Sequence, residues 1–259
     1  MASILLPVVY ALIGIITGIL TGITGSSGVV IVVPALSFLG HTFQQAVGTS
    51  LLVDVITTVS VTYAYLARKN VRIALGLSLG AGAIIGAQIG ALIALSLPEV
   101  PLELAFGIFT FLMAIRAFRS RKKHIKAQVS EEEVQRGKLW YLSAGSLSIM
   151  VGIVTGTMGA SGGIMFIAIM MLIFRGMEVK TMVGTATLAM FLSAGSGATA
   201  YVISGAVDIE AALIIGLFGL ISGYFFGKKA NDLKPGTIYL FLGSLFVLVA
   251  ISEIFRALY

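Results

Sequence analysis

Apolar runs fill almost the whole chain, and their lengths constrain its fold more than any other feature of the sequence. Five runs lie on each side of a charged stretch, at about 4–24, 28–39, 43–66, 73–97 and 101–118, and at about 139–158, 162–174, 178–203, 209–230 and 236–258. A helix needs about 20 mostly apolar residues to span a bilayer, because it rises about 1.5 Å per residue. The second run of each half is too short, so we expect a half-helix or a re-entrant segment there.

The composition fits an all-α integral membrane protein. Hydrophobic residues make up 58% of the chain and charged residues 11%, whereas a soluble domain has about 25% charged residues. There is no cysteine and there are two histidines, which excludes disulfides, cysteine nucleophiles and a histidine metal cluster. The basic residues lie in short loops between apolar runs, so they indicate membrane topology rather than nucleic-acid binding. We expect no metal, no cofactor and no enzymatic activity.

An internal repeat relates the two groups of runs. Residues 18–28 (GILTGITGSSG) match residues 152–162 (GIVTGTMGASG), and the Val-Gly-Thr of residues 47–49 recurs at 183–185. Two rows of glycines spaced four residues apart also match and indicate close helix packing; they are Gly82, Gly86 and Gly90, and Gly219, Gly223 and Gly227. The order is kept, so we divide the chain into an N-terminal transmembrane repeat (1–118), a basic linker (119–138) and a C-terminal transmembrane repeat (139–259).

The positions of lysine and arginine predict the orientation. Basic residues cluster at 68–72, 116–138, 175–180 and 228–234, while the loops near Glu99 and Asp208 carry acids and no basic residue. The positive-inside rule makes the basic side, including the linker, cytoplasmic and both termini external. An odd number of crossings per half makes the second repeat inverted relative to the first. Five full crossings per half, and three crossings with a re-entrant hairpin, both satisfy this count. We expect a multi-pass protein of the plasma membrane.

Glycine-serine breaks precede the short run of each half. Gly25, Ser26, Ser27 and Gly28 form the first; the second comprises Gly159, Ala160, Ser161, Gly162 and Gly163. Irregular backbone at membrane depth is tolerated where it is buried in protein or lines a cavity. A half-helix that begins at such a break directs free N–H groups and its positive dipole end inward, which favours an anion. We predict that both breaks bind substrate. The alternative is a tight glycine turn between packed helices.

Hydroxyl side chains follow each break. Thr49, Ser50, Thr185 and Thr187 begin the third run of their halves and are predicted to contact the substrate. Helical spacing places Ser50, Asp54, Thr57, Thr58 and Tyr65 on one face. Such hydroxyl rows equally form hydrogen bonds to neighbouring helices or to their own backbone, so the sequence leaves pore lining and packing both open.

Asp54 is interpreted as the single acid inside the predicted spans, close to the middle of its run. A charge there costs about 2.5–3.5 kcal/mol on the insertion scale, so its side chain faces protein or water. We predict a proton-coupling group, since a neutral Asp54 tolerates a nearby anion and an ionised one repels it. The alternative is a buried acid held by Ser and Thr hydroxyls, because its repeat partner is Met190. His41 and His124 are predicted to be solvated loop residues.

These motifs resemble the TauE/SafE family of sulfite exporters, also called the 4-toluene sulfonate uptake permeases. The resemblance rests on the first break, on Val-Pro-Ala-Leu at 33–36 and on Ala-Val-Gly-Thr-Ser at 46–50, and the second half echoes it at 159–163 and 183–186. Ser26, Ser27 and Val29 depart from the more glycine-rich first motif of that family. The resemblance implies transport of sulfur-containing anions such as sulfite or organosulfonates across a prokaryotic plasma membrane.

The sequence favours a secondary transporter in which the two halves rock around a central anion site. We find no nucleotide-binding motif, so gradients supply the energy. The same scaffold could instead form an anion channel, or the basic linker could make the protein a membrane scaffold. The expected partners are a small anionic substrate and the lipid bilayer, with a homo-oligomer left open.

Overall fold

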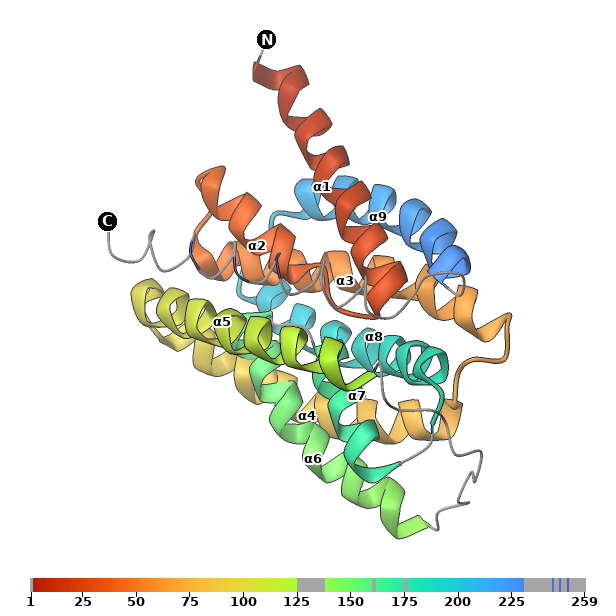
Figure 1. Ribbon diagram of the computed structural model, residues 1–259. Coiled ribbons are helices and arrows are strands. Elements are labelled where there is room, and N and C mark those ends of the chain that lie inside the picture. Colours follow the sequence, from red (N-terminus) through yellow and green to blue (C-terminus); the bar gives the residue numbers. More distant parts are fainter. Residues whose placement is uncertain are drawn as a thin grey trace.

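The computed structural model describes residues 2–124, 138–159, 162–174 and 177–230, together with residues 244, 247 and 251. Over these residues the chain is all-α (Figure 1). The helices are α1 (Ala2–Thr24), α2 (Val29–Phe38), α3 (Phe43–Leu66), α4 (Ile73–Ser96), α5 (Glu99–His124), α6 (Lys138–Met158), α7 (Gly162–Ile173), α8 (Val179–Ile203) and α9 (Ile209–Lys229). The predicted fold class is confirmed.

Every predicted run within the described residues forms a helix. The two short runs are α2, with 10 residues, and α7, with 12. Within the described part of the chain, six helices are long and apolar enough to cross a membrane, namely α1, α3, α4, α6, α8 and α9. Helix α5 continues beyond the predicted end of its run to His124. The predicted run 236–258 lies almost wholly outside the described residues, as does most of the linker, so the division into two repeats stays a prediction.

Local signals set several helix ends. Helix α3 begins at a capping box, in which the Gln45 N–H donates to Thr42 Oγ1 at 3.2 Å and the Thr42 N–H donates to Gln45 Oε1 at 3.3 Å. Asp208 caps α9 by accepting the Ala211 N–H at 2.9 Å. Helices α1 and α6 both end before a glycine with positive φ, 63° at Gly25 and 62° at Gly159. That conformation favours glycine and turns the chain out of the helix.

Glycine rows bring helices into backbone contact. Helix α4 packs on α6, and a methyl group on Gly82, Gly86 or Gly90 would overlap a carbonyl oxygen of α6. Helix α1 packs on α9 in the same manner through Gly14, Gly18 and Gly22. The other predicted row, on α9, faces side chains of α3. The interpretation of these rows as packing surfaces is confirmed.

Helix pairs recur between the halves. Helix α4 packs on α6 and α8, as α9 packs on α1 and α3, while α3 and α8 pack on each other (Figure 1). Thr62 contacts Thr187 and Leu51 contacts Gly197, so residue numbers rise along α3 as they fall along α8 and the two helices run antiparallel. Two hydrogen bonds also recur, because Tyr65 Oη donates to the Gly22 carbonyl at 3.1 Å and Tyr201 Oη donates to the Gly156 carbonyl at 2.9 Å.

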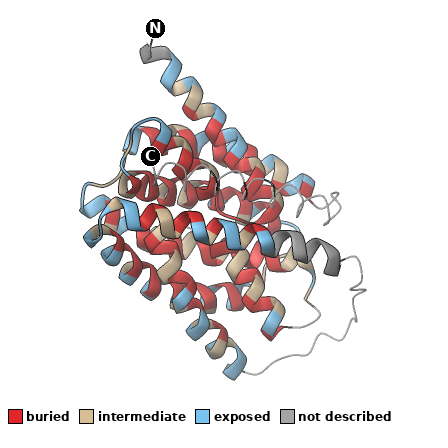
Figure 2. Cartoon of the chain, turned by 60° about the vertical axis from the view of Figure 1, so that its left-hand side comes forward, coloured by how far each residue is buried: buried red, intermediate tan, exposed pale blue. Residues whose placement is uncertain are grey.

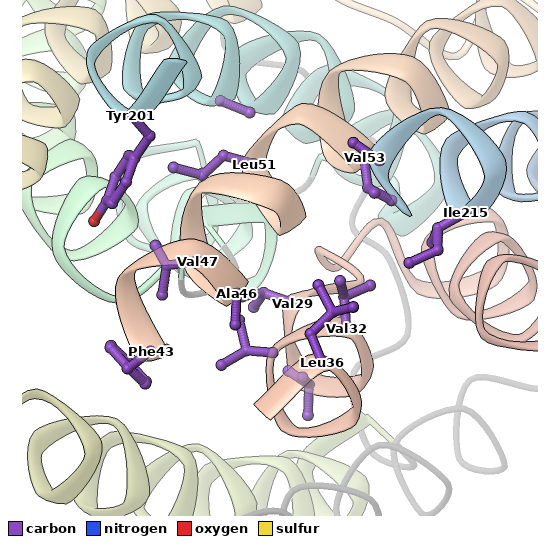
Figure 3. Close-up of a cluster of buried hydrophobic side chains, with 14 of the residues drawn as sticks. Val29, Val32, Leu36, Phe43, Ala46, Val47, Leu51, Val53, Tyr201 and Ile215 are labelled. Atoms are coloured by element: carbon purple, nitrogen blue, oxygen red, sulfur yellow. The ribbon is translucent and has the colours of Figure 1, made fainter. Parts of the chain in front are cut away.

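Buried residues line the inner faces of the helices, and large apolar side chains remain exposed on the outer faces (Figure 2). Helix α2 is held by an apolar cluster in which Val29, Val32 and Leu36 lie near Ala46 and Val47 of α3 (Figure 3). This packing fixes the start of α2 inside the bundle, beside the middle of α3.

Candidate functional site at the paired helix breaks

The first break is a buried loop whose hydroxyls bond to one another. The Gly25 N–H donates to the Thr21 carbonyl at 2.9 Å. Thr24 Oγ1 accepts the Ser26 N–H at 3.0 Å and lies 2.7 Å from Ser26 Oγ. Ser26 is fully buried and Ser27 nearly so. The loop is therefore held by hydrogen bonds among its own polar groups in the buried interior of the bundle.

A carboxylate from α3 occupies the start of α2. The Gly28 N–H donates to Asp54 Oδ1 at 3.0 Å, and Ser27 Oγ donates to Asp54 Oδ2. Ser27 Oγ also accepts the Val29 N–H at 3.0 Å. Asp54 is 2% exposed. A helix N-terminus favours negative charge through its unpaired N–H groups and its dipole, and here it contacts an acidic side chain that belongs to the chain itself.

The second break lies directly against the first. A methyl group on Gly163 would overlap the Gly25 carbonyl oxygen. A methyl group on Gly25 would lie 2.7 Å from Val183 Cγ1, and one on Gly159 would lie 2.7 Å from Val29 Cγ2. Gly162 and Gly163 begin α7 and are buried, while Ala160 and Ser161 lie outside the described residues. The two predicted breaks thus come together at the centre of the bundle.

The two breaks differ in the side chain that approaches each short helix. Asp54 reaches Gly28 at the start of α2. At the start of α7 the corresponding residue is Met190, and a methyl group on Gly163 would lie 2.6 Å from its sulfur. A thioether carries no charge, so the second break receives no counterpart of the Asp54 carboxylate from α8.

The predicted hydroxyls do not all gather at the breaks. The Asp208 N–H donates to Thr49 Oγ1 at 2.9 Å, and the Arg72 N–H donates to Thr185 Oγ1 at 3.0 Å. Since α3 and α8 run antiparallel, these threonines lie toward opposite ends of the bundle, where each binds a loop of the other half. Thr187 donates to the Gly184 carbonyl at 2.8 Å. A direct contact of these three residues with substrate stays a prediction.

Other buried hydroxyls lie on α1, which leads into the first break, and on α3, which carries Asp54. Thr17, Thr21, Ser50 and Thr57 are each 0% exposed, and their hydroxyls find no hydrogen-bond partner within the described part of the chain. A methyl group on Gly28 would overlap Thr17 Cγ2 and lie 3.3 Å from Thr17 Oγ1, so this side chain covers the start of α2. Thr17 and Thr21 are not among the predicted site residues, although their spacing of one helical turn just before Gly25 indicates a shared face.

Three expectations about ionisable residues are wrong. His124 was predicted to lie in a loop but is the last residue of helix α5. Glu103 lies within the predicted run 101–118 and is 4% exposed, so Asp54 is not the single acid inside the predicted spans. His41 is not simply solvated: its Nδ1 lies 3.1 Å from the Leu36 carbonyl oxygen and its Nε2 lies 2.9 Å from Asp208 Oδ2. Partial burial opposes the charge of Asp208, but hydrogen bonds from the Ala211 N–H and from His41 outweigh it and lower the pKa of Asp208. This ion pair links a loop of each half.

Comparisons with known proteins agree with the sequence motifs. A family model described as "Sulfite exporter TauE/SafE" matches residues 10–252. Two relatives come from Bacillus subtilis (strain 168). "Probable membrane transporter protein YunE" is 28% identical over 97% of this chain and 98% of its own length. "Probable membrane transporter protein YdhB" is 30% identical over 85% of this chain and 89% of its own length. No solved structure matches significantly.

Proposed function

The chain belongs to the TauE/SafE family of membrane transporters, and on that premise we propose that it is a secondary transporter of small sulfur-containing anions such as sulfite or an organosulfonate. One observation carries the anion site: the start of α2 binds the Asp54 carboxylate through the Gly28 N–H and the Ser27 hydroxyl. Among the described residues, these donors hold the Asp54 carboxylate without a lysine or arginine, which supports an anion site at the centre of the bundle. Sulfite and sulfonate groups present oxygen acceptors of the same kind.

The strength of such a site suits transport. A helix end contributes about 0.3–2 kcal/mol to the binding of a negative charge. A carrier must also release its substrate on the far side of the membrane, so a modest electrostatic attraction at the site favours release and turnover over tight binding. The contact between the two breaks, through Gly163 and the Gly25 carbonyl, supports a single central site shared by both halves.

An inverted repeat offers a route to alternating access. Antiparallel packing of α3 and α8, with the recurring helix pairs, supports two oppositely oriented halves that rock about the paired breaks. Basic residues at Arg68, Lys69 and Arg72, and at Lys228 and Lys229, support a cytoplasmic location for those ends of the bundle in a plasma membrane. Asp54 is the candidate for coupling to a proton gradient.

Ligand binding to purified protein tests the substrate class. We expect the melting temperature in detergent to rise with sulfite, thiosulfate or a sulfonate such as sulfoacetate, because a ligand that binds only the folded state stabilises it by mass action. Sodium salts of matched ionic strength serve as the control. Stabilisation by a cation or a neutral solute in place of every sulfur oxyanion would contradict the proposal.

A paired substitution then tests the site. Ser27→Ala removes a donor at the first break and is expected to weaken the stabilising effect of the oxyanion. Ser96→Ala is the matched control, because Ser96 is exposed at the end of α4 and bonds to the Ile93 carbonyl of its own helix. An equal response to the anion in the wild type and in both variants would reject the break as the binding site.

A further inference from the structure

We infer that Asp54 is a tethered anion that competes directly with the substrate for the start of α2. Ionised, its carboxylate occupies the Gly28 N–H and the Ser27 hydroxyl and excludes a second anion. When it is protonated, it leaves these donors, and the head group of the substrate takes its place. This inference rests on the proposed function and goes further, because it makes the Asp54 carboxylate and the substrate mutually exclusive ligands of the same donors.

The geometry of the carboxylate is that of a bound ligand. Both of its oxygens are used, Oδ1 by the Gly28 N–H at 3.0 Å and Oδ2 by Ser27 Oγ. These donors lie 26 and 27 residues away in the sequence, so tertiary packing, not a local turn, brings the acid to the start of α2. A head group that binds the same two donors must displace the carboxylate.

Thr17 supplies an independent observation that the site accepts more than a carboxylate. Its side chain is 0% exposed and covers Gly28, and its hydroxyl has no partner among the described residues. A buried hydroxyl without a partner is costly, so natural proteins seldom keep one unused. A carboxylate offers two oxygens, whereas a sulfite or sulfonate head group offers three. The third oxygen is placed to accept from Thr17.

The surroundings of Asp54 make simultaneous occupancy by two anions unfavourable. Lys and Arg side chains that the structure describes lie at helix ends and loops, with Arg68, Lys69 and Arg72 after α3, Lys180 in the first turn of α8, and Lys228 and Lys229 in the last turn of α9. Helix α2 carries no ionisable residue. Among the side chains that the structure describes, the other helices packed on α3 contribute these further ionisable groups: Tyr10 of α1, Glu99 and Glu103 of α5, Tyr201 of α8, and Glu210 and Tyr224 of α9. None of these groups is a cation that could neutralise a second negative charge.

Competition fixes the proton balance. Each substrate anion that binds is accompanied by one proton, which Asp54 takes up from solution. The complex therefore gains one negative charge from the anion and one positive charge from the proton. Linkage then requires the affinity for a fully ionised anion to fall about tenfold per pH unit once Asp54 is ionised in the free protein. Below that range the affinity is constant.

Binding of methanesulfonate tests the inference, since the charge of this probe is fixed between about pH 5 and about pH 8. Wild-type protein in detergent is expected to bind it more weakly as the pH rises, with uptake of one proton per bound anion in weakly buffered solution. Asp54→Ala is expected to bind at every pH with the affinity that the wild type reaches at low pH, and without proton uptake. Glu210→Gln, an exposed acid on α9, is the matched control and should titrate like the wild type.

The outcomes separate the two proposals. If the wild type binds methanesulfonate without proton uptake, or if Asp54→Ala binds more weakly than the wild type at every pH, the competition is refuted while anion transport stands. If folded wild type binds no sulfur oxyanion at any pH, the proposed function fails as well. Proton uptake is measured on the wild type, so the test does not depend on the folding of a variant. Thr17→Val should weaken binding at low pH and leave the slope with pH unchanged.

Discussion

The two helix breaks have similar backbone conformations but contact side chains of different chemistry. Both begin with a glycine of nearly equal positive φ, and both lead into a short apolar helix. The first break receives the Asp54 carboxylate, and the second receives the uncharged Met190. The two breaks therefore have similar backbones, and the residue that reaches each from the third helix of its half, Asp54 or Met190, gives them different chemistry.

The loops through which each half contacts the other show the same contrast. Thr49 and Thr185 each accept a backbone N–H from the other half, so this bond recurs. The His41–Asp208 pair has no counterpart in the other half, because Met177 stands at the position that corresponds to His41 and Arg72 at the position that corresponds to Asp208. Packing and backbone bonds follow the repeat, whereas the ionisable side chains break it.

The largest effect is expected from neutralising Asp54. Asp54→Asn keeps the size of the side chain but cannot release a proton, so accumulation driven by a pH gradient should fall at least tenfold while exchange of labelled substrate continues. Met190→Leu, the matched change at the second break, should keep gradient-driven accumulation. Flux into proteoliposomes at equal protein content is the measurement. Normal gradient-driven accumulation by the Asp54→Asn variant would contradict a functional difference between the two breaks.

Forcing the breaks apart is expected to cost stability. Gly163→Ala places a methyl group into the Gly25 carbonyl, so the free energy of unfolding should fall by about 1–3 kcal/mol or more. Gly195→Ala is the control, since its methyl group would lie 3.9 Å from Val55 Cγ2 and meets no closer neighbour. Equilibrium unfolding in mixed micelles compares them. Equal stability of the two variants would contradict the contact between the breaks.

Several of these features follow from the sequence. Runs at about 28–39 and 162–174 correspond to Val29–Phe38 and Gly162–Ile173, because apolar length and glycine breaks are local signals. The carboxylate on Gly28 was not predicted, since it depends on how α2 folds back onto α3. His41 was misjudged for a similar reason, because its partner Asp208 is 167 residues away. The sequence placed Thr49 at the start of its run but carried no information about which loop it contacts.

A smaller and equal effect in both halves is expected from the buried tyrosines. Tyr65→Phe and Tyr201→Phe each remove one hydrogen bond to a glycine carbonyl, so each should lower the free energy of unfolding by about 1 kcal/mol. Tyr63→Phe serves as the control, because Tyr63 is exposed on α3. A large loss of unfolding free energy in one variant and none in the other would contradict equal contributions of these two hydrogen bonds to stability.

The smallest effect is expected at the His41–Asp208 pair. The pKa of Asp208 is lowered in the folded protein, so its contribution to stability is present above the ordinary carboxyl range and is lost as pH falls through the lowered value. Both side chains are partly exposed, so this contribution is about 0.5–1 kcal/mol. Asp208→Asn should flatten the decline in melting temperature at acid pH. An unchanged pH profile would exclude a stabilising pair.

Counterflow gives the most direct test of the central claim, that this chain carries sulfur oxyanions by alternating access through the paired breaks. Proteoliposomes are loaded with unlabelled sulfite or sulfonate and diluted into a trace of the labelled anion. A carrier exchanges one for the other, so the label should rise transiently above its equilibrium level and the initial rate should saturate with substrate. A flux that reaches equilibrium without this overshoot and never saturates would indicate a channel and contradict the account.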